Sequence, residues 1–282
     1  METVRAAAVS WAIQECASPD AFLGHAADLV GRAARLGAEL VVLPESIDLE
    51  RISYHGPIPQ EDVAATLASE FPQVRAHCES LARDYGITLV AGSHLHEVEG
   101  QYFNSALVCT PDSSFLQPKN VLTQWELEEW RISEGQGLKL AEDQRLGTLV
   151  CYDSEFPGSA RALCEAGAKI LAVPAYNEFP RGFHRVRWSC HARSVECQVF
   201  VIHSALVGSL GREPVSRTYG SSAILCPPVE PFREDGILAQ TPFNEESIAV
   251  ADLPIGLIEE ARDRDDVRNW HDRDKGNWQI LT

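Results

Sequence analysis

The chain has 282 residues, 45% of them hydrophobic, which is enough for one large domain, and no shift in composition marks a linker. A formal net charge of −17 and a pI near 4.9 argue against nucleic acid or an anionic membrane as a partner, because both would repel most of the surface. Eight cysteines spread through apolar stretches favour reduced thiols, and no apolar run reaches ~18 residues, so we expect a cytoplasmic protein without a membrane span.

The first half of the chain alternates apolar strand patterns with helical ones. Strands are expected at 4–11, 39–43, 87–96 and 102–109, and helices at 19–36 and 60–85. Ser18 followed by Pro19 is typical of a helix start. Pro44 closes the second strand, which leaves Glu45 at its carboxyl end.

The second half contains a strand that ends at a cysteine. The apolar run 145–151 stops at Cys151 and turns at 156–158 into a helix over 159–166. Such an elbow presents the thiol and leaves backbone N–H groups free to stabilise an oxyanion, although a buried structural cysteine would have the same composition. Further strands are expected at 169–173, 199–205, 222–226 and 247–253, and helices at 182–197 and 254–262.

Two segments of the chain share one pattern. Residues 32–44 and 161–174 each read as helix, Gly-Ala, apolar strand and proline, and each follows a strand led by arginine. The chain therefore predicts two β-α-β halves. Two sheets packed face to face, with helices outside each, would bring strand ends of both halves to one edge, where Cys151 and Glu45 would meet.

Three motifs, taken in order, resemble a known family. The stretches 43–45, 118–123 and 149–157 resemble the Glu, Lys and Cys signatures of the nitrilase superfamily, the carbon–nitrogen hydrolases, and the similarity extends through 181–187. The resemblance implies an α/β fold, a four-layer αββα sandwich with two packed mixed β-sheets. It also implies no metal or organic cofactor, and a homodimer or higher homo-oligomer formed through the helices after Cys151 and Gly182.

The same resemblance assigns catalytic roles. Cys151 would be the nucleophile and Glu45 the general base, while Lys119 and the Tyr152 backbone amide would hold the oxyanion. Glu126 ends a Leu-Thr-x-x-Glu pattern and fits the second glutamate of the family. Its two acidic neighbours, Glu128 and Glu129, are instead expected to be a solvated helix start.

The substrate is expected to be a small-molecule amide or nitrile bound by loops after the strand ends. Trp125 and Asn177 are candidate substrate-binding residues, with Tyr54, Tyr176 and His184 near the same pocket. Glu155 stands where relatives that act on carboxylated amides often have arginine. If Glu155 faces the pocket, neutral or cationic amides are favoured; the alternative is a pair with an arginine such as Arg187 or Arg193.

An amidase is the expected activity, and several alternatives remain open. A nitrilase, an N-carbamoyl amide hydrolase or acyl transfer to an amine would use the same residues, and a catalytically silent binding protein would keep only the fold. A zinc site is conceivable at His94 and His96 or at His184, Cys190 and His191, but no C-x-x-C or H-E-x-x-H accompanies them. A serine hydrolase lacks its G-x-S-x-G elbow.

The domain is expected to span 1–262, followed by a charged tail over 263–282. The tail carries Trp270 and Trp278, and tryptophans on a polar arm often anchor it to another surface. A partner subunit and the chain's own body are both candidates for that surface. Val121 stands where many members of the family have histidine.

Overall fold

The computed structural model describes residues 2–141, 145–264 and 267–275, and it is an α/β fold built on one curled, mixed sheet. The strands run in the order β5-β4-β3-β2-β1-β9-β8-β7-β6, with β12 also on β1, β10 on β9 and β11 on β10. They are β1 (Val4–Ile13), β2 (Leu40–Val42), β3 (Thr88–Val98), β4 (Gln101–Cys109), β5 (Ser114–Pro118), β6 (Leu140–Ala141), β7 (Leu146–Thr148), β8 (Ile170–Ala175), β9 (Phe200–Gly208), β10 (Ala223–Leu225), β11 (Ile237–Gln240) and β12 (Ser247–Leu253).

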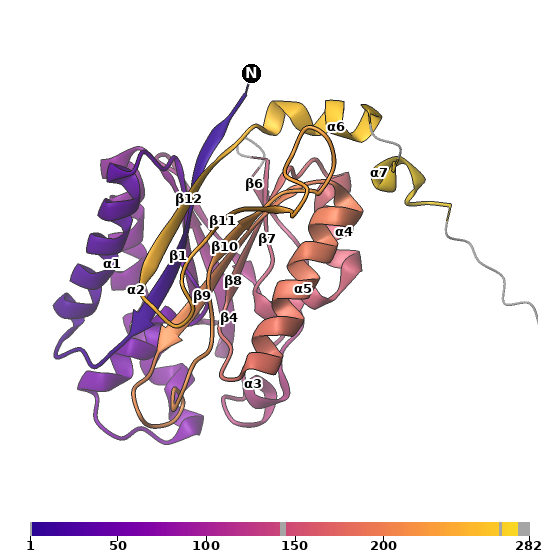
Figure 1. Cartoon of the computed structure of the whole chain (residues 1–282). Helices are drawn as coiled ribbons and strands as arrows, with labels where there is room; N and C mark the ends of the chain where they lie inside the picture. The colour runs from indigo at the N-terminus through magenta and orange to yellow at the C-terminus, as the bar shows by residue number, and fades with distance from the viewer. Residues whose placement is uncertain (1, 142–144, 265–266, 276–282) are drawn as a thin grey trace, which may run out of the picture.

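Helices flank the sheet on two sides (Figure 1). Helices α1 and α2 lie on one side, and α4 and α5 lie on the other. The helices are α1 (Pro19–Arg35), α2 (Gln60–Tyr85), α3 (Gln124–Glu128), α4 (Pro157–Glu165), α5 (Pro180–Cys197), α6 (Ile258–Arg264) and α7 (Asn269–Asp272), with 3₁₀ turns η1 (Ile47–Tyr54), η3 (Cys151–Glu155) and η4 (Ile255–Leu257). Within the described ranges, no helix combines the length and the apolar character needed to cross a bilayer.

Strand β1 joins the two halves of the sheet. Its first part pairs antiparallel with β12 and parallel with β2, and its last three residues, Trp11–Ile13, pair parallel with residues 206–208 of β9. The strands therefore form one continuous hydrogen-bonded network. The predicted α/β class is confirmed, whereas the division of the strands into two packed sheets stays a prediction.

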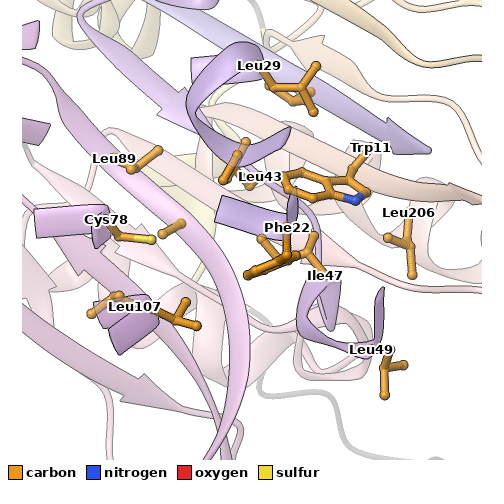
Figure 2. Close-up of a cluster of buried hydrophobic side chains, with 14 of the residues drawn as sticks. Trp11, Phe22, Leu29, Leu43, Ile47, Leu49, Cys78, Leu89, Leu107 and Leu206 are labelled. Atoms are coloured by element: carbon orange, nitrogen blue, oxygen red, sulfur yellow. The ribbon is translucent and has the colours of Figure 1, made fainter. Parts of the chain in front are cut away.

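Alternating side chains of the central strands build separate parts of the core. Trp11, Leu43 and Leu89 pack with Phe22 and Leu29 of α1 in the cluster of Figure 2. Side chains of the opposite parity form a second cluster that joins the two halves of the sheet: Ala6, Ala8, Val42, Ile170 and Ile202. This alternation follows from the two-residue period of a strand. Each buried leucine or isoleucine stabilises the fold by about 1.5–3 kcal/mol.

The strand that leads to Cys151 is shorter than its apolar run suggests. The sequence predicts a strand over 145–151, but β7 ends at Thr148, and Cys151 already has a left-handed backbone at φ 46°. The short elements β5 and η1 are not predicted at all, and α3 is anticipated only as a helix start at Glu128 and Glu129, which the structure places at its other end. Their residues are too few to show a period, and β5 is defined by its pairing with β4.

A histidine of α1 links η1 to the segment before β12. His25 of α1 lies 3.0 Å from Glu50 Oε1 through Nδ1 and 2.8 Å from Glu246 Oε2 through Nε2. The indole N–H of Trp11 also donates a hydrogen bond to the Glu50 carboxylate, at 2.8 Å. Burial alone would lower the pKa of His25, but its hydrogen bonds to Glu246 and Glu50 outweigh burial and raise that pKa to about 9.

We predict that this bridge makes stability depend on alkaline pH. A histidine whose folded pKa exceeds its unfolded value stabilises the fold fully below about pH 6.5, and the contribution is lost as pH rises through about 9. The difference in the free energy of urea unfolding between the wild type and His25→Gln should therefore shrink from pH 6 to pH 10. The control is His77→Gln, because His77 hydrogen-bonds to the Leu23 carbonyl oxygen and, in the described ranges, forms no ion pair with a carboxylate. A difference that stays constant with pH would contradict the prediction.

Candidate active site

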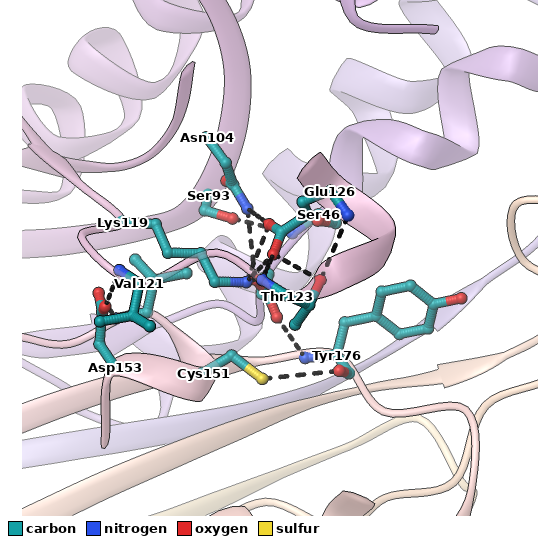
Figure 3. Close-up of polar contacts among 12 residues, drawn as sticks. Ser46, Ser93, Asn104, Lys119, Val121, Thr123, Glu126, Cys151, Asp153 and Tyr176 are labelled. Carbon is teal, nitrogen blue, oxygen red and sulfur yellow. Dashed lines mark hydrogen bonds and ion pairs between the residues drawn. The ribbon is translucent and has the colours of Figure 1, made fainter. Parts of the chain in front are cut away.

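Four reactive side chains converge at one edge of the sheet (Figure 3). Glu45 follows β2, Lys119 follows β5, Glu126 lies on α3, and Cys151 begins η3 after β7. Figure 3 labels the last three. All four are buried, with 2–5% of their surface exposed. They line a cavity of about 560 Å³. Segments distant in sequence are thus joined at the ends of strands, the usual location of ligand sites in α/β sheets.

The ammonium of Lys119 lies between two carboxylates. Its Nζ atom is 2.8 Å from Glu45 Oε1, and 2.9 and 2.7 Å from the two oxygens of Glu126. Asn104 of β4 donates to both acids, at 3.0 Å to Glu126 and 3.3 Å to Glu45. The site therefore holds two carboxyl groups and one ammonium group away from water, where their electrostatic interaction is strong.

The two carboxylates have opposite pKa shifts. Burial raises the pKa of Glu45, and the charge of Lys119 does not fully offset that burial while the charge of Glu126 adds to it. Burial acts on Glu126 as well, but there Lys119 and several hydrogen bonds outweigh it and lower the pKa. Burial would lower the pKa of Lys119, yet the two acids hold it above its usual range. Lys119 and Glu126 thus stay charged, and Glu45 has the greater proton affinity.

Cys151 has a strained backbone and a protonated thiol. Its φ of 46° lies in the left-handed region, which a side chain other than glycine or asparagine seldom adopts and which often marks a functional site. Burial raises the pKa of the thiol well above its usual value, and the negative charge of Glu45 adds to this. The thiol therefore needs a neighbouring base before it can attack a substrate.

Tyr176, which follows β8, connects the cysteine with the glutamate through its backbone. The Cys151 thiol donates to the Tyr176 carbonyl oxygen at 3.6 Å, and the Tyr176 N–H donates to Glu45 Oε2 at 2.9 Å. Figure 3 shows both contacts on the side of the site away from Asn104. One peptide segment thereby orients the thiol and the glutamate toward the same cavity.

A capping box places Glu126. The Glu126 carboxylate accepts from the Thr123 N–H at 2.9 Å and from its hydroxyl at 2.8 Å, while the Thr123 hydroxyl caps the helix by accepting from the Glu126 N–H. This is the physical meaning of the Thr-x-x-Glu spacing. Glu128 and Glu129 are exposed, as expected, but they are the last residue and the C-cap of α3, so the expectation that they form a helix start is wrong; the helix begins after Thr123.

The predicted substrate-binding residues divide into two groups. Trp125 and Asn177 line the cavity, as does Tyr176. Tyr152 and Glu155 do not belong to that lining. The Tyr152 ring packs edge to face on Phe156, with centroids 5.0 Å apart. Its backbone N–H can still serve as an oxyanion donor, because the first N–H groups of η3 have no partner inside the helix.

Glu155 pairs with an arginine that the sequence did not indicate. Its carboxylate lies 3.3 Å from Nε of Arg185, rather than contacting Arg187 or Arg193. Arg185 itself lines the cavity, together with Glu178, Phe179 and Arg181. Arg185 is therefore the member of this ion pair that lines the cavity, and Glu155 lies outside the lining.

Two residues named near the pocket lie elsewhere. Tyr54 donates its hydroxyl proton to Glu70 at 2.7 Å, and the His184 ring stacks on Trp188. Sequence reasoning also missed Asn104, which sits inside a strand without any motif. It named Asp153 only as part of the cysteine motif, although this carboxylate accepts from backbone amides beside Lys119.

The rival zinc sites do not assemble. Throughout the described ranges, no group of three or more histidine, cysteine or acidic side chains is arranged to hold a metal ion. A second cavity of about 740 Å³ lies beside α7, lined by Arg161, Cys197, Trp270 and Arg273 among others. It is the larger of the two, but it lacks a paired base and nucleophile, so the chemistry favours the cavity at Cys151.

Comparison with known proteins places the chain in a family. The model of the carbon–nitrogen hydrolase family matches residues 5–263. The chain is 28% identical to "Probable hydrolase YhcX" of Bacillus subtilis over 98% of its own length, and spans 55% of that protein. It is 26% identical to a nitrilase of Pyrococcus abyssi, covering 88% of each chain, and 26% identical to omega-amidase NIT2 of Danio rerio, covering 85% of each.

Solved structures share the fold. A carbon–nitrogen hydrolase from Helicobacter pylori G27 superimposes with a TM-score of 0.76 at 22% identity, over 92% of each chain. A double mutant of an amidase from Nesterenkonia sp. AN1, in complex with acrylamide, gives 0.73 at 24% identity, over 95% of this chain and 97% of that one. At these identities the likeness concerns the fold.

We predict that Glu126 is needed for stability as well as for the site. Its removal would leave Lys119 and Asn104 with Glu45 but without their second buried carboxylate, and would take the acceptor from Thr123, so Glu126→Ala should lower the free energy of unfolding by about 3 kcal/mol in urea titration. The matched control is Glu129→Ala on the same turn, which should change it by less than about 0.5 kcal/mol because Glu129 is exposed. Equal effects of the two substitutions would refute this role.

Proposed function

The chain belongs to the carbon–nitrogen hydrolase family, and on that premise we propose that it hydrolyses a small-molecule amide through an acyl-enzyme on Cys151. The products would be a carboxylic acid and ammonia or an amine. The observation that carries this proposal is the buried Lys119 between Glu45 and Glu126, in one cavity with the Cys151 thiol. This combination supplies a nucleophile, a base and an oxyanion partner in one place.

The first half of the reaction would form the thioester. Glu45 takes the thiol proton as Cys151 Sγ bonds to the amide carbon, and negative charge develops on the amide oxygen. Lys119 and the Tyr152 N–H hold that charge without reorganising. The C–N bond then breaks, and Glu45 returns the proton to the leaving nitrogen. The raised pKa of Glu45 suits it to accept and return a proton.

The second half would release the acid. Water enters where the amine has left, and Glu45 accepts one of its protons as the oxygen bonds to the thioester carbon. Collapse of this second tetrahedral species breaks the C–S bond, and the proton returns to sulfur. Glu126 keeps Lys119 in place throughout, since it stays ionised and holds the ammonium through both oxygens.

The lining favours an amide with a neutral substituent. Trp125, Tyr176 and Phe179 offer aromatic surface, and Glu155 neutralises Arg185 from behind. The relatives named an omega-amidase and an amidase support an amide over a nitrile. The nitrilase of Pyrococcus abyssi supports a nitrile as the second candidate, which the same thiol could attack.

We extend the proposal to architecture and assembly. The two halves of the curled sheet, joined through β1, would form the two sheets of a four-layer αββα sandwich in a domain over 1–262. A homodimer would bury α4 and α5, since Trp188 of α5 is 66% exposed. Eight free cysteines suit a reducing, cytoplasmic environment.

The charged tail over 263–282 is proposed to continue this interface. The guanidinium carbons of Arg262 and Arg273 lie 4.0 and 4.1 Å from the centroid of the Trp270 ring, which also packs against the chain's own core. Trp270 therefore packs on its own chain, which is one of the two expected surfaces, and a contact with a partner subunit stays a proposal. Trp278 lies outside the described residues.

The central prediction concerns turnover. Cys151→Ala should abolish ammonia release from a panel of amides, nitriles and N-carbamoyl compounds, because the residues that line the cavity include no second thiol. Glu45→Gln and Lys119→Ala should each lower kcat/KM by about a hundredfold or more. Cys78→Ala is the matched control, since Cys78 is buried in the core of α2 and should leave turnover unchanged.

Two outcomes would contradict that proposal. If Cys151→Ala released ammonia at the wild-type rate, Cys151 would not be the nucleophile. Tight binding of an amide without release of ammonia, or of any acyl-transfer product, would identify a binding protein that retains the fold.

A separate prediction concerns charge selection. Glu155→Gln leaves Arg185 unpaired at the cavity, so kcat/KM for a carboxylated amide should rise about tenfold relative to a neutral amide of the same length. Glu165→Gln is the control, because Glu165 pairs with Arg161 on α4, away from the cavity. An unchanged ratio in Glu155→Gln would mean that Arg185 does not meet substrate.

A further inference from the structure

Asp153 is a buried carboxylate held by backbone amides. It is 2% exposed, and its Oδ1 accepts from the Val121 N–H at 2.8 Å. The Asn120 N–H donates to both oxygens, at 3.1 and 3.2 Å, and the Val150 N–H reaches Oδ2 at 3.4 Å. Across the described residues, no ion pair of Asp153 with a basic side chain is formed within 4.0 Å.

The donors belong to the two segments that carry the reactive groups. Asn120 and Val121 directly follow Lys119, and Val150 directly precedes Cys151. Asp153 itself lies two residues after Cys151, within η3. Figure 3 shows its carboxylate beside Val121, on the opposite side of Lys119 from Glu126. One side chain thus spans from the lysine segment to the cysteine turn.

The same residue closes the turn on which the thiol stands. The Asp153 N–H donates to the Val150 carbonyl at 3.0 Å, while its carboxylate accepts from the Val150 N–H. Cys151 lies inside this ring with its left-handed φ of 46°. A strained residue keeps such a backbone only where its surroundings enforce it, at a cost of about 1–3 kcal/mol. The two hydrogen bonds between Asp153 and Val150 hold the Cys151 backbone in this conformation.

We propose that Asp153 is a positioning residue that holds the Lys119 segment against the Cys151 turn and so fixes Nζ relative to Sγ. Its kinetic consequence rests on the proposed function, whereas its effect on the thiol does not. A displacement of about 1 Å in such a pair can reduce a rate by about a hundredfold. Asp153 touches neither substrate nor reacting atoms in this role.

The electrostatics distinguish positioning from a purely structural role. Burial raises the pKa of Asp153 to about 6, although its backbone hydrogen bonds and Lys119 lower it. A raised carboxyl pKa means that the protonated form stabilises the fold below about pH 4, and that this contribution is lost as pH rises through about 6. At neutral pH the charge therefore costs stability, so removing it should not unfold the protein.

The decisive variant is Asp153→Asn, which keeps the size but loses the charge and one acceptor. At pH 7.5 its kcat for the best amide should fall about a hundredfold with KM changed less than about threefold, and its urea midpoint should not fall. Alkylation of Cys151 by iodoacetamide, followed by mass spectrometry of the cysteine peptide, should slow by about tenfold, because the thiolate loses the fixed charge of Lys119.

The matched control is Glu50→Gln, another buried carboxylate, which bonds to Trp11 and His25 outside the cavity. This control should lose stability and keep kcat, the opposite result. Wild-type rates of turnover and alkylation in Asp153→Asn would overturn the inference, as would losses that only match its unfolded fraction. If Asp153→Asn does not fold, Asp153→Glu must fold and show at least about a tenfold slower alkylation, and a wild-type rate there overturns the inference.

Failure of the proposed function would look different. If the wild type releases no ammonia from any compound, the amidase proposal falls, but alkylation of Cys151 still reports how the thiol is held. A slower alkylation in Asp153→Asn would then support positioning alone.

Discussion

One buried ammonium connects the parts of this site. Lys119 contributes a positive charge that neither Glu45 nor Glu126 could do without, because two ionised carboxylates so close together in a buried cavity would repel each other strongly. The three residues come from the ends of β2 and β5 and from α3, so the charge balance requires these segments to meet. The meeting point also fixes where α3 starts, since Glu126 both binds Lys119 and caps the helix through Thr123.

The inequality of the two carboxylates gives this cluster its chemical use. Both contact the same nitrogen, but Glu126 accepts further hydrogen bonds from Asn104 and from Thr123, which favour its ionised form. Burial is the largest effect on Glu45 and the charge of Glu126 adds to it, so the pKa of Glu45 rises although Lys119 and the hydrogen bond from the Cys151 thiol lower it. A symmetric pair would divide the proton between two sites. Here the proton affinity is concentrated on the carboxylate that faces the nucleophile.

The residues that the sequence could predict are those with short-range patterns. Glu45 and Cys151 stand at the ends of apolar runs, Lys119 lies in a recognisable motif, and Glu126 ends the Leu-Thr-x-x-Glu pattern. Asn104 and Arg185 could not be found in this way, because their roles depend on which segments the fold brings beside them. The same holds for the pairing of β1 with β9, which joins the halves through only three residues of each strand.

Asp153 shows why a buried acid can be held by amides instead of by a cation. A lysine or arginine paired with it would stabilise its charge more strongly. That cation would also lie near Glu45 and Cys151 and would lower both of their pKa values, which would weaken the base while leaving the thiolate a poorer nucleophile. Backbone N–H groups supply hydrogen bonds without a net charge, so they fix the carboxylate and leave Lys119 as the cation that acts on Glu45 and on Cys151. The raised pKa of Asp153 is the stability cost of keeping that single charge dominant.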